Sequence, residues 1–299
     1  MNRTIIKNLI STNQAFSGHL DIPRTNGSKM KTGKLYIEDS GETQDTRGVL
    51  VCFPGIGDVR TSFRFLVDTF VPKGYRVIIA DIRGMGDSWE GFNEFTPESV
   101  ATDISEVIKQ RQLTQNVILV GNSLSAGSCI LSAAQHSNIV KGIIMLGPII
   151  HDLPADKYFR PISHLLFNRI WGSTLWSGYY AGLYKRDTKP TGYENHLNDI
   201  KKSLRKSKVI GSVGKFIRAP KNGVENSIPN LTCPTIAIYG DQDPDFSDVP
   251  KEKEWLLNKT KGHRNVDAFI LEKVGHYPHV EAFDETKSII EQFLNRILE

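Results

Sequence analysis

The chain has 299 residues, of which 39% are hydrophobic and 23% are charged, and its formal net charge is +4. This balance is typical of a folded globular protein and excludes general disorder, while so small a positive charge does not by itself indicate nucleic-acid binding. The three cysteines are an odd number without metal-binding spacing, so we expect free thiols in a reducing compartment.

The beginning of the chain, MNRTIIKNLISTNQAF, has a basic residue and several apolar ones. Lys7 and Asn8 interrupt the apolar residues, so the core of a signal peptide does not form. The longest apolar runs in the rest of the chain are far shorter than a membrane span. We therefore expect a cytoplasmic protein without stable membrane insertion.

Short apolar runs rich in Val, Ile and Leu recur along the chain. They are GVLVCFPG (48–55), YRVIIAD (75–81), NVILVGN (116–122), VKGIIMLGP (140–148) and PTIAIYGD (234–241). Because these runs do not alternate with polar residues, they indicate strands that are buried on both faces, as in a parallel sheet. A further strand is expected within DAFILEKVGH (267–276).

Segments with helical spacing separate or follow these runs. The predicted helices cover 61–74, 96–112, 123–137, 251–260 and 281–299. Thr96 and Pro97 favour a helix start, and Gly74 favours a helix end. The alternation of strands and helices predicts an α/β fold with a mostly parallel central sheet flanked by helices.

The alternation stops after Pro148 and resumes at Pro234. The segment between them is rich in aromatic residues, and from Lys201 to Lys221 it contains eight Lys or Arg and no Asp or Glu. We interpret 150–229 as a helical cap inserted into an α/β core that comprises 1–149 and 230–299. The basic stretch is typical of a solvated helix face, and it also suits attraction of an anionic substrate or membrane surface.

Ser123 lies where a buried strand runs directly into a helix, in LVGNSLSAG. A sharp strand–turn–helix connection exposes one side chain at the carboxyl edge of the sheet. The turn needs small residues two positions to either side, and Gly121 and Ser125 occupy those positions. Ser123 is therefore the candidate nucleophile, and the alternative is that it only caps the helix.

A serine nucleophile needs a base within hydrogen-bond reach and an acid that orients the base. The segment VGHYPHVE follows the final predicted strand and supplies His276 as the candidate base. His279 lies closer to the start of the last helix, where we expect a surface role. The segment GDQDPDFSD supplies Asp243 as the first choice of acid and Asp245 as the second.

Acyl transfer also needs donors for the developing oxyanion. We expect the main-chain N–H groups of Leu124, directly after the nucleophile, and of Ile56, between two glycines in FPGIGDVR. Aromatic residues of the inserted segment are candidates for an apolar substrate pocket, although packing within the segment explains them equally well. These candidates are Trp171, Trp176 and Tyr180.

The motifs PGIGD, DIRGMGDS, GNSLSAG, GDQDPDF and GHYPHVE, in this order, resemble those of the α/β-hydrolase fold superfamily. The order Ser123, Asp243, His276 is that of its catalytic triad. The resemblance implies a serine hydrolase that acts through an acyl-enzyme on an ester-type small-molecule acyl substrate, with no cofactor. Two positions depart from the common pattern: Phe-Pro precedes the first glycine of the oxyanion loop, and Ser125 replaces the second elbow glycine.

Other classes of function explain fewer of these residues. A dinucleotide site is disfavoured because Arg60 replaces the third glycine of G-x-G-x-x-G. His276 and His279 lack the spacing of a metal hydrolase, so no metal is expected, and nucleic acid is not an expected partner. A non-catalytic ligand-binding relative of the same fold, and a hydrolase of lactones or carbon–carbon bonds, stay open as alternatives. The oligomeric state does not follow from the sequence.

Overall fold

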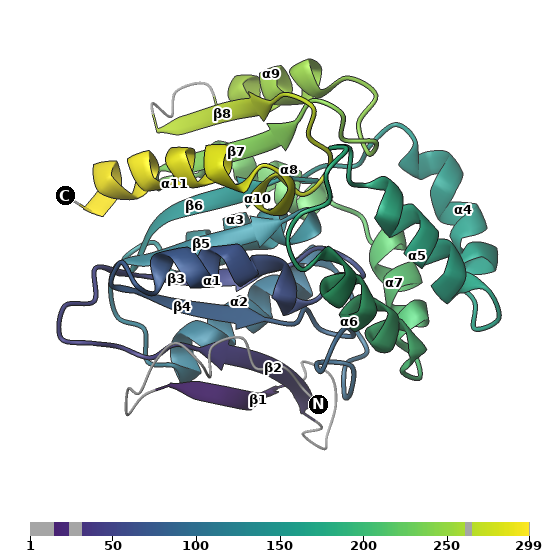
Figure 1. Cartoon of the computed structure of the whole chain (residues 1–299), viewed down its shortest axis with the longest axis horizontal. Helices are drawn as coiled ribbons and strands as arrows, with labels where there is room; N and C mark the ends of the chain where they lie inside the picture. Colours follow the sequence, from purple (N-terminus) through teal and green to yellow (C-terminus); the bar gives the residue numbers. More distant parts are fainter. Residues whose placement is uncertain (1–14, 24–31, 261–264, 299) are drawn as a thin grey trace.

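The computed structural model describes residues 15–23, 32–260 and 265–298. Within them, an eight-stranded sheet has the order β1-β2-β4-β3-β5-β6-β7-β8 (Figure 1). The strands are β1 Phe16–Ile22, β2 Gly33–Asp39, β3 Gly48–Phe53, β4 Tyr75–Ala80, β5 Val117–Asn122, β6 Val140–Leu146, β7 Thr235–Gly240 and β8 Val266–Leu271. Strands β4, β3, β5, β6, β7 and β8 are parallel neighbours, which confirms the predicted mostly parallel sheet.

Strands β1 and β2 extend the sheet in antiparallel fashion, and the apolar runs did not predict them. Strand β2 carries Glu38 and Asp39, which are both buried. Arg60 donates to Glu38 at 2.7 Å and Arg76 donates to Asp39 at 2.7 Å. Because buried charges are tolerated when they are paired, an apolar pattern is not required in this strand.

Helices cover both faces of the sheet (Figure 1). Helices α1 and α11 pack on one face through Leu66, Phe70 and Phe293, whereas α2 and α3 pack on the other. Thr96 caps α2 as predicted, because its hydroxyl accepts the N–H of Ser99. The helices outside the inserted segment are η2 Arg60–Phe63, α1 Arg64–Phe70, α2 Pro97–Gln110, α3 Leu124–Gln135, α9 Val249–Lys259, α10 Pro278–Glu281 and α11 Phe283–Leu298.

The inserted segment between β6 and β7 is helical. It contains α4 Asp156–Leu166, α5 Gly172–Gly182, α6 Tyr193–Arg205, α7 Val209–Arg218 and α8 Asn222–Ser227, followed by η3 Ile228–Asn230. Helices α4 to α7 gather at the end of the molecule toward which the parallel strands point (Figure 1). Helix α8 instead packs against α2 and α3, so this part of the predicted cap segment lies among the core helices.

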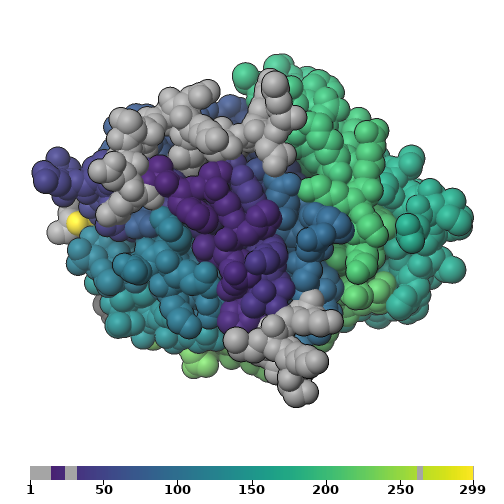
Figure 2. Space-filling model, turned by 90° about the horizontal axis from the view of Figure 1, so that it is seen from below, coloured from purple at the N-terminus to yellow at the C-terminus, as the bar shows by residue number. Residues whose placement is uncertain are grey.

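Figure 2 shows the molecule from the side of β1 and β2, with the inserted helices at one end. None of the described helices combines the length and apolar character that a membrane crossing requires. The arrangement leaves the carboxyl ends of β3, β5, β7 and β8 facing the inserted helices, and these ends carry the candidate site residues.

Candidate active site

Ser123 occupies the joint between β5 and α3, with φ of 56° and ψ of −125°. Such a conformation is sparsely populated by residues other than glycine and is typical of functional turns. A Cβ atom on residue 121 would lie 2.5 Å from the carbonyl oxygen of Ser125, so the turn requires Gly121. The Ser123 side chain makes no helix-capping hydrogen bond, which argues against a role as a helix cap alone.

Ser125 joins the elbow to the loop after β3. Its hydroxyl donates to the carbonyl oxygen of Pro54 at 2.6 Å, and the side chain is buried. Pro54 is two residues before Ile56, one of the two candidate oxyanion donors. Ser125, which stands where the family pattern has the second elbow glycine, therefore links the loop that carries Ile56 to the elbow that carries Leu124. These two residues are the expected oxyanion donors.

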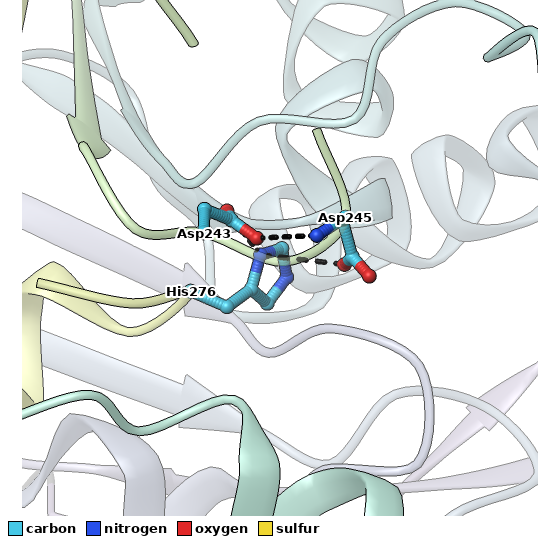
Figure 3. Close-up of side chains that lie close together, drawn as sticks. All are labelled: Asp243, Asp245 and His276. Atoms are coloured by element: carbon cyan, nitrogen blue, oxygen red, sulfur yellow. Dashed lines mark hydrogen bonds and ion pairs between the residues drawn. The ribbon is translucent and has the colours of Figure 1, made fainter. Parts of the chain in front are cut away.

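His276 lies on the loop after β8 and faces two carboxylates from the loop after β7 (Figure 3). Its Nδ1 atom is 2.7 Å from Oδ2 of Asp243 and 3.5 Å from Oδ2 of Asp245. The main-chain N–H of Asp245 donates to Oδ1 of Asp243 at 3.0 Å. The shorter distance and nearly complete burial of Asp243 favour it over Asp245 as the partner of the imidazole.

Electrostatics at this cluster favour the charged imidazole. Burial acts to lower the pKa of His276, but Asp243 and Asp245 outweigh it and raise the pKa to about 9. Burial raises the pKa of the Asp245 carboxyl, and the charge of His276 opposes that rise. The two carboxylates thus stabilise a proton on the imidazole, as a base that takes a proton in the transition state requires.

Asp243, Asp245 and His276 also form a set of ligand types that a metal ion accepts, with one atom from each within 4.8 Å of the others. Nδ1 of His276 already lies at hydrogen-bond distance from Asp243. A cation between them would have to replace this hydrogen bond, so we interpret the cluster as a hydrogen-bonded pair with a neighbouring carboxylate.

Ser123 and His276 line the same cavity, which has a volume of about 440 Å³. This volume is in the range of small-molecule pockets. Ile56 and Leu124 line it too, and the N–H of Leu124 has no intrahelical acceptor because Leu124 is the first residue of α3. The remaining lining is mostly apolar: Ile149, Leu153, Ala155, Asp156, Phe159, Leu166, Phe167, Leu175, Trp176, Tyr179, Leu183, Ile217, Lys221, Pro244, Asp245 and Tyr277.

Of the three aromatic residues chosen as pocket candidates, Trp176 lines this cavity and the other two lie elsewhere. Trp171 is half-exposed in the turn between α4 and α5, where its Nε1 donates to the carbonyl oxygen of Leu165. Tyr180 is fully buried, with its hydroxyl 2.8 Å from Nε2 of His196. Leu175 and Tyr179 of α5 and Leu183, the residue directly after the helix, line the cavity at a spacing of four residues. Residues at this spacing share one face of a helix, so Tyr180 lies beside that face.

Helix α5 and the residue that follows it contact three of the four connections that carry the candidate site, namely those after β3, β7 and β8. Trp176 Nε1 donates to the carbonyl oxygen of Gly57 at 3.2 Å, and the Tyr179 hydroxyl donates to Asp245. The N–H of His276 donates to the carbonyl oxygen of Leu183 at 3.0 Å. Sequence reasoning missed Tyr179 and Leu183. An aromatic pattern at four-residue spacing could have indicated Tyr179. Leu183 contributes through its backbone carbonyl, which every residue type has, so the sequence carries no signal for it.

His279 does not lie at the surface, contrary to the sequence-based expectation. It is fully buried, its Nε2 is 2.9 Å from the Ser62 hydroxyl, and its ring stacks on Phe63. Burial lowers its pKa to about 3. The expectation was wrong because the short helix α10, which carries His279, packs against η2 and α1 instead of facing solvent.

The basic stretch from Lys201 to Lys221 is used in part for internal contacts. Lys206 donates to Asp87 at 2.7 Å, which joins α6 to the loop after β4. Lys221 is buried at the cavity wall and donates to Asp156 at 3.0 Å. These two cations therefore do not present free charge, and the exposed Lys202 pairs with Asp199 at 3.1 Å, whereas Arg205 and Lys208 are exposed.

Comparison with known proteins places this geometry in a family. The family model for the α/β hydrolase fold matches residues 48–283. Serine hydrolase BPHL of Mus musculus is 22% identical over 266 residues, which cover 87% of this chain and 82% of that protein. The 2-hydroxy-6-oxononadienedioate/2-hydroxy-6-oxononatrienedioate hydrolase of Pseudomonas sp is 21% identical over 285 residues, 88% of this chain and 93% of that protein.

Among solved structures, a thermophilic esterase from Thermogutta terrifontis superposes with a TM-score of 0.73 and 19% identity. The superposition covers 94% of this chain and 99% of that one, so the two proteins share the fold. The family match spans most of the chain, from the first parallel strand to the start of the last helix. The protein therefore belongs to the α/β hydrolase fold family, as its five motifs predicted.

Proposed function

We propose that the protein is a serine hydrolase that cleaves an ester-type small-molecule substrate through an acyl-enzyme. One observation carries the proposal: Ser123 and His276 open into one mostly apolar cavity, while the far side of the imidazole is held 2.7 Å from Asp243. Both features support an arrangement of nucleophile, base and orienting acid, which acyl transfer requires.

In the proposed reaction, the Ser123 hydroxyl attacks the carbonyl carbon while His276 accepts its proton. Asp243 accepts the Nδ1–H hydrogen bond, which fixes the tautomer and leaves Nε2 to act as the base. The N–H groups of Ile56 and Leu124 stabilise the tetrahedral oxyanion. His276 then gives the proton to the leaving alcohol, and a water molecule, activated by the same imidazole, releases the acid and restores Ser123.

The chemistry of the cavity supports an apolar acyl or alcohol group in the substrate. Phe159, Phe167 and Leu175 contribute apolar walls. The one lysine in the lining, Lys221, is neutralised by Asp156 and does not offer a site for an anion. As part of the same proposal, we interpret α4 to α7 as the cap that separates this cavity from bulk water.

The test is a panel of chromogenic esters of increasing acyl length, assayed with the native chain and with Ser123→Ala. We expect hydrolysis of esters with apolar acyl groups and a loss of roughly 10³-fold or more in kcat for Ser123→Ala. Hydrolysis that survives the substitution would overturn the proposal.

The same preparation distinguishes the alternative functions. A fluorophosphonate probe should label the native chain and leave Ser123→Ala unlabelled, whereas a non-catalytic ligand-binding relative would resist labelling in both forms. Because one relative is named as a dienedioate hydrolase, a substrate of that class and a lactone belong in the panel. A much higher kcat/KM for either would replace the ester as the proposed substrate.

A further inference from the structure

Exposed apolar side chains are concentrated in one part of the described chain. Nine large hydrophobic residues are exposed in the described chain as a whole, and eight of them lie within 158–179. The eight residues, which we call the α4–α5 patch, are Tyr158, Phe159, Ile162, Leu165, Ile170, Trp171, Leu175 and Tyr179. A concentration of this kind on a globular protein marks an interaction surface.

The α4–α5 patch is continuous with the wall of the active-site cavity. Phe159, Leu175 and Tyr179 belong to both, since each is exposed and each lines the cavity. Trp171 Nε1 donates to the Leu165 carbonyl oxygen, which joins the end of α4 to the start of α5. Figures 1 and 2 show that these helices form one end of the molecule. The mouth of the cavity therefore lies within an apolar outer surface.

The exposed charged side chains of the segment that carries the patch are cations, although Asp156 and Asp187 flank the segment and Asp245 accepts the hydroxyl of Tyr179. Residues 157–186 contain five Lys or Arg and no Asp or Glu. Lys157, Arg169 and Lys185 are exposed, and Lys157 Nζ lies 4.7 Å from the centre of the Tyr158 ring. The surface thus combines large apolar side chains with cations that adjoin them, which is the composition of a helix that lies in the interface of an anionic membrane.

We propose that the α4–α5 patch docks reversibly on an anionic lipid surface. Ile162, Leu165 and Ile170 would enter the boundary between headgroups and acyl chains, while the neighbouring cations meet anionic headgroups. A second copy of the chain suits the patch less well, because a twofold interface would place like charges opposite each other. Resting on the proposed function, the docked orientation lets an apolar ester pass from the lipid into the cavity.

The experiment measures co-sedimentation of the full chain carrying Ser123→Ala with vesicles, so that binding is read without turnover. Vesicles of phosphatidylcholine alone are compared with vesicles that also contain phosphatidylglycerol, at low and at high salt. We expect binding to the anionic vesicles that weakens by at least about tenfold on neutral vesicles and in high salt. Because catalysis is absent from this assay, its outcome is independent of the proposed hydrolysis.

Three substitutions test the apolar part of the surface. Ile162→Ser, Leu165→Ser and Ile170→Ser, combined, should weaken binding to anionic vesicles by at least about tenfold. Phe269→Ser is the matched control, since Phe269 is the ninth exposed apolar residue and lies on β8, away from the patch. Ile170→Ser alone, at a residue that is 84% exposed, gives a second variant whose folding is least at risk.

Several results would overturn the proposal: no sedimentation with anionic vesicles at low salt, equal binding to neutral ones, or patch variants that bind as tightly as Phe269→Ser. A further overturning result would come from sedimentation velocity, if the native chain were a dimer that the patch substitutions dissociate. In that case the patch would be a contact between copies of this chain.

Discussion

At the scale of single residues, the effect of Asp245 on the pKa of His276 can be measured directly. It lies 3.5 Å from Nδ1 of His276, and it adds to Asp243 in raising the pKa of that histidine to about 9. In the proposed reaction neutral His276 is the base, so activity should rise as the pH passes upward through this pKa. The acid limb of the profile should therefore lie above pH 6.5, the ordinary pKa of histidine.

Asp245→Asn removes one of the two charges that favour the imidazolium. We expect the acid limb of the kcat/KM profile to move to lower pH, by about one unit or less, with the plateau rate largely retained. Asp284→Asn makes the same charge change at a side chain that is 89% exposed, and should leave the limb in place. A limb that does not move in Asp245→Asn would show that Asp245 does not contribute to the basicity of His276.

Ser125 tests whether the elbow positions the oxyanion loop. Ser125→Ala leaves the buried carbonyl of Pro54 without its donor, and we expect a loss of about 1–3 kcal/mol in the free energy of unfolding together with a lower kcat. Ser128→Ala is a close control, because Ser128 is buried on the same helix and its hydroxyl donates to the carbonyl of Pro97 at 2.9 Å. It should lose similar stability and keep its kcat. Equal kcat in both variants would contradict a positioning role for Ser125.

At the scale of elements, α5 and the loop that carries His276 meet through their backbones. A Cβ atom on residue 275 would lie 1.9 Å from the carbonyl oxygen of Leu183, the acceptor of the His276 N–H. Gly275→Ala should therefore force the two segments apart, lower the Tm and reduce kcat through a displaced imidazole. Gly178→Ala, in α5 with open space around it, should leave kcat unchanged and stabilise the helix by about 1 kcal/mol. Thermal unfolding and ester kinetics on both variants provide the comparison.

The elements that sequence could predict are those whose pattern is set by burial alone. Strands β3 to β7 include continuous apolar runs, because nearly all of their residues are covered on both faces, whereas β8 lies at the edge of the sheet and none of its residues is fully buried. Strand β2 was missed because Glu38 and Asp39 are buried as ion pairs whose partners lie far away in sequence. A single-sequence pattern cannot reveal a pairing of that kind.

The residues of the candidate site also divide into those that the sequence could predict and those that it could not. Ser123, Asp243 and His276 could be chosen because each follows a strand, and parallel strands bring their carboxyl ends to one edge. The cavity wall could not be predicted residue by residue, since Tyr179 and Tyr180 are adjacent in sequence and only the packing of α5 decides which one faces the cavity. His279 was misplaced because the contact between α10 and η2 leaves no local signal.

At the scale of the whole molecule, stability should depend on pH through His279. Its pKa is lowered to about 3 in the folded chain, against an ordinary 6.5. Between pH 3 and pH 6.5 the unfolded chain binds a proton at His279 that the folded chain does not bind. The contribution of neutral His279 to the free energy of unfolding is therefore complete above pH 6.5 and is lost as the pH falls toward 3. The slope is at most about 1.4 kcal/mol per pH unit.

Urea unfolding of His279→Gln across this range should give a shallower decline than the native chain, even though the substitution itself lowers stability at neutral pH. His164→Gln, at an exposed histidine of α4, should decline as steeply as the native chain. Parallel declines in His279→Gln and the native chain would mean that other groups dominate acid unfolding.

The inserted helices are anchored unevenly to the loops around the cavity. Trp176, Tyr179 and Leu183 bind α5 and the residue after it to the loops that follow β3, β7 and β8, and His196 pairs α6 with Asp58 at 3.0 Å. Helix α4 has no such bond to those loops, and Pro161 interrupts its own backbone ladder. Passage through the cavity mouth should therefore proceed by local displacement of α4 while α5 and α6 keep their positions. Among the inserted helices, amide hydrogen exchange should be fastest in the segment of α4 around Pro161.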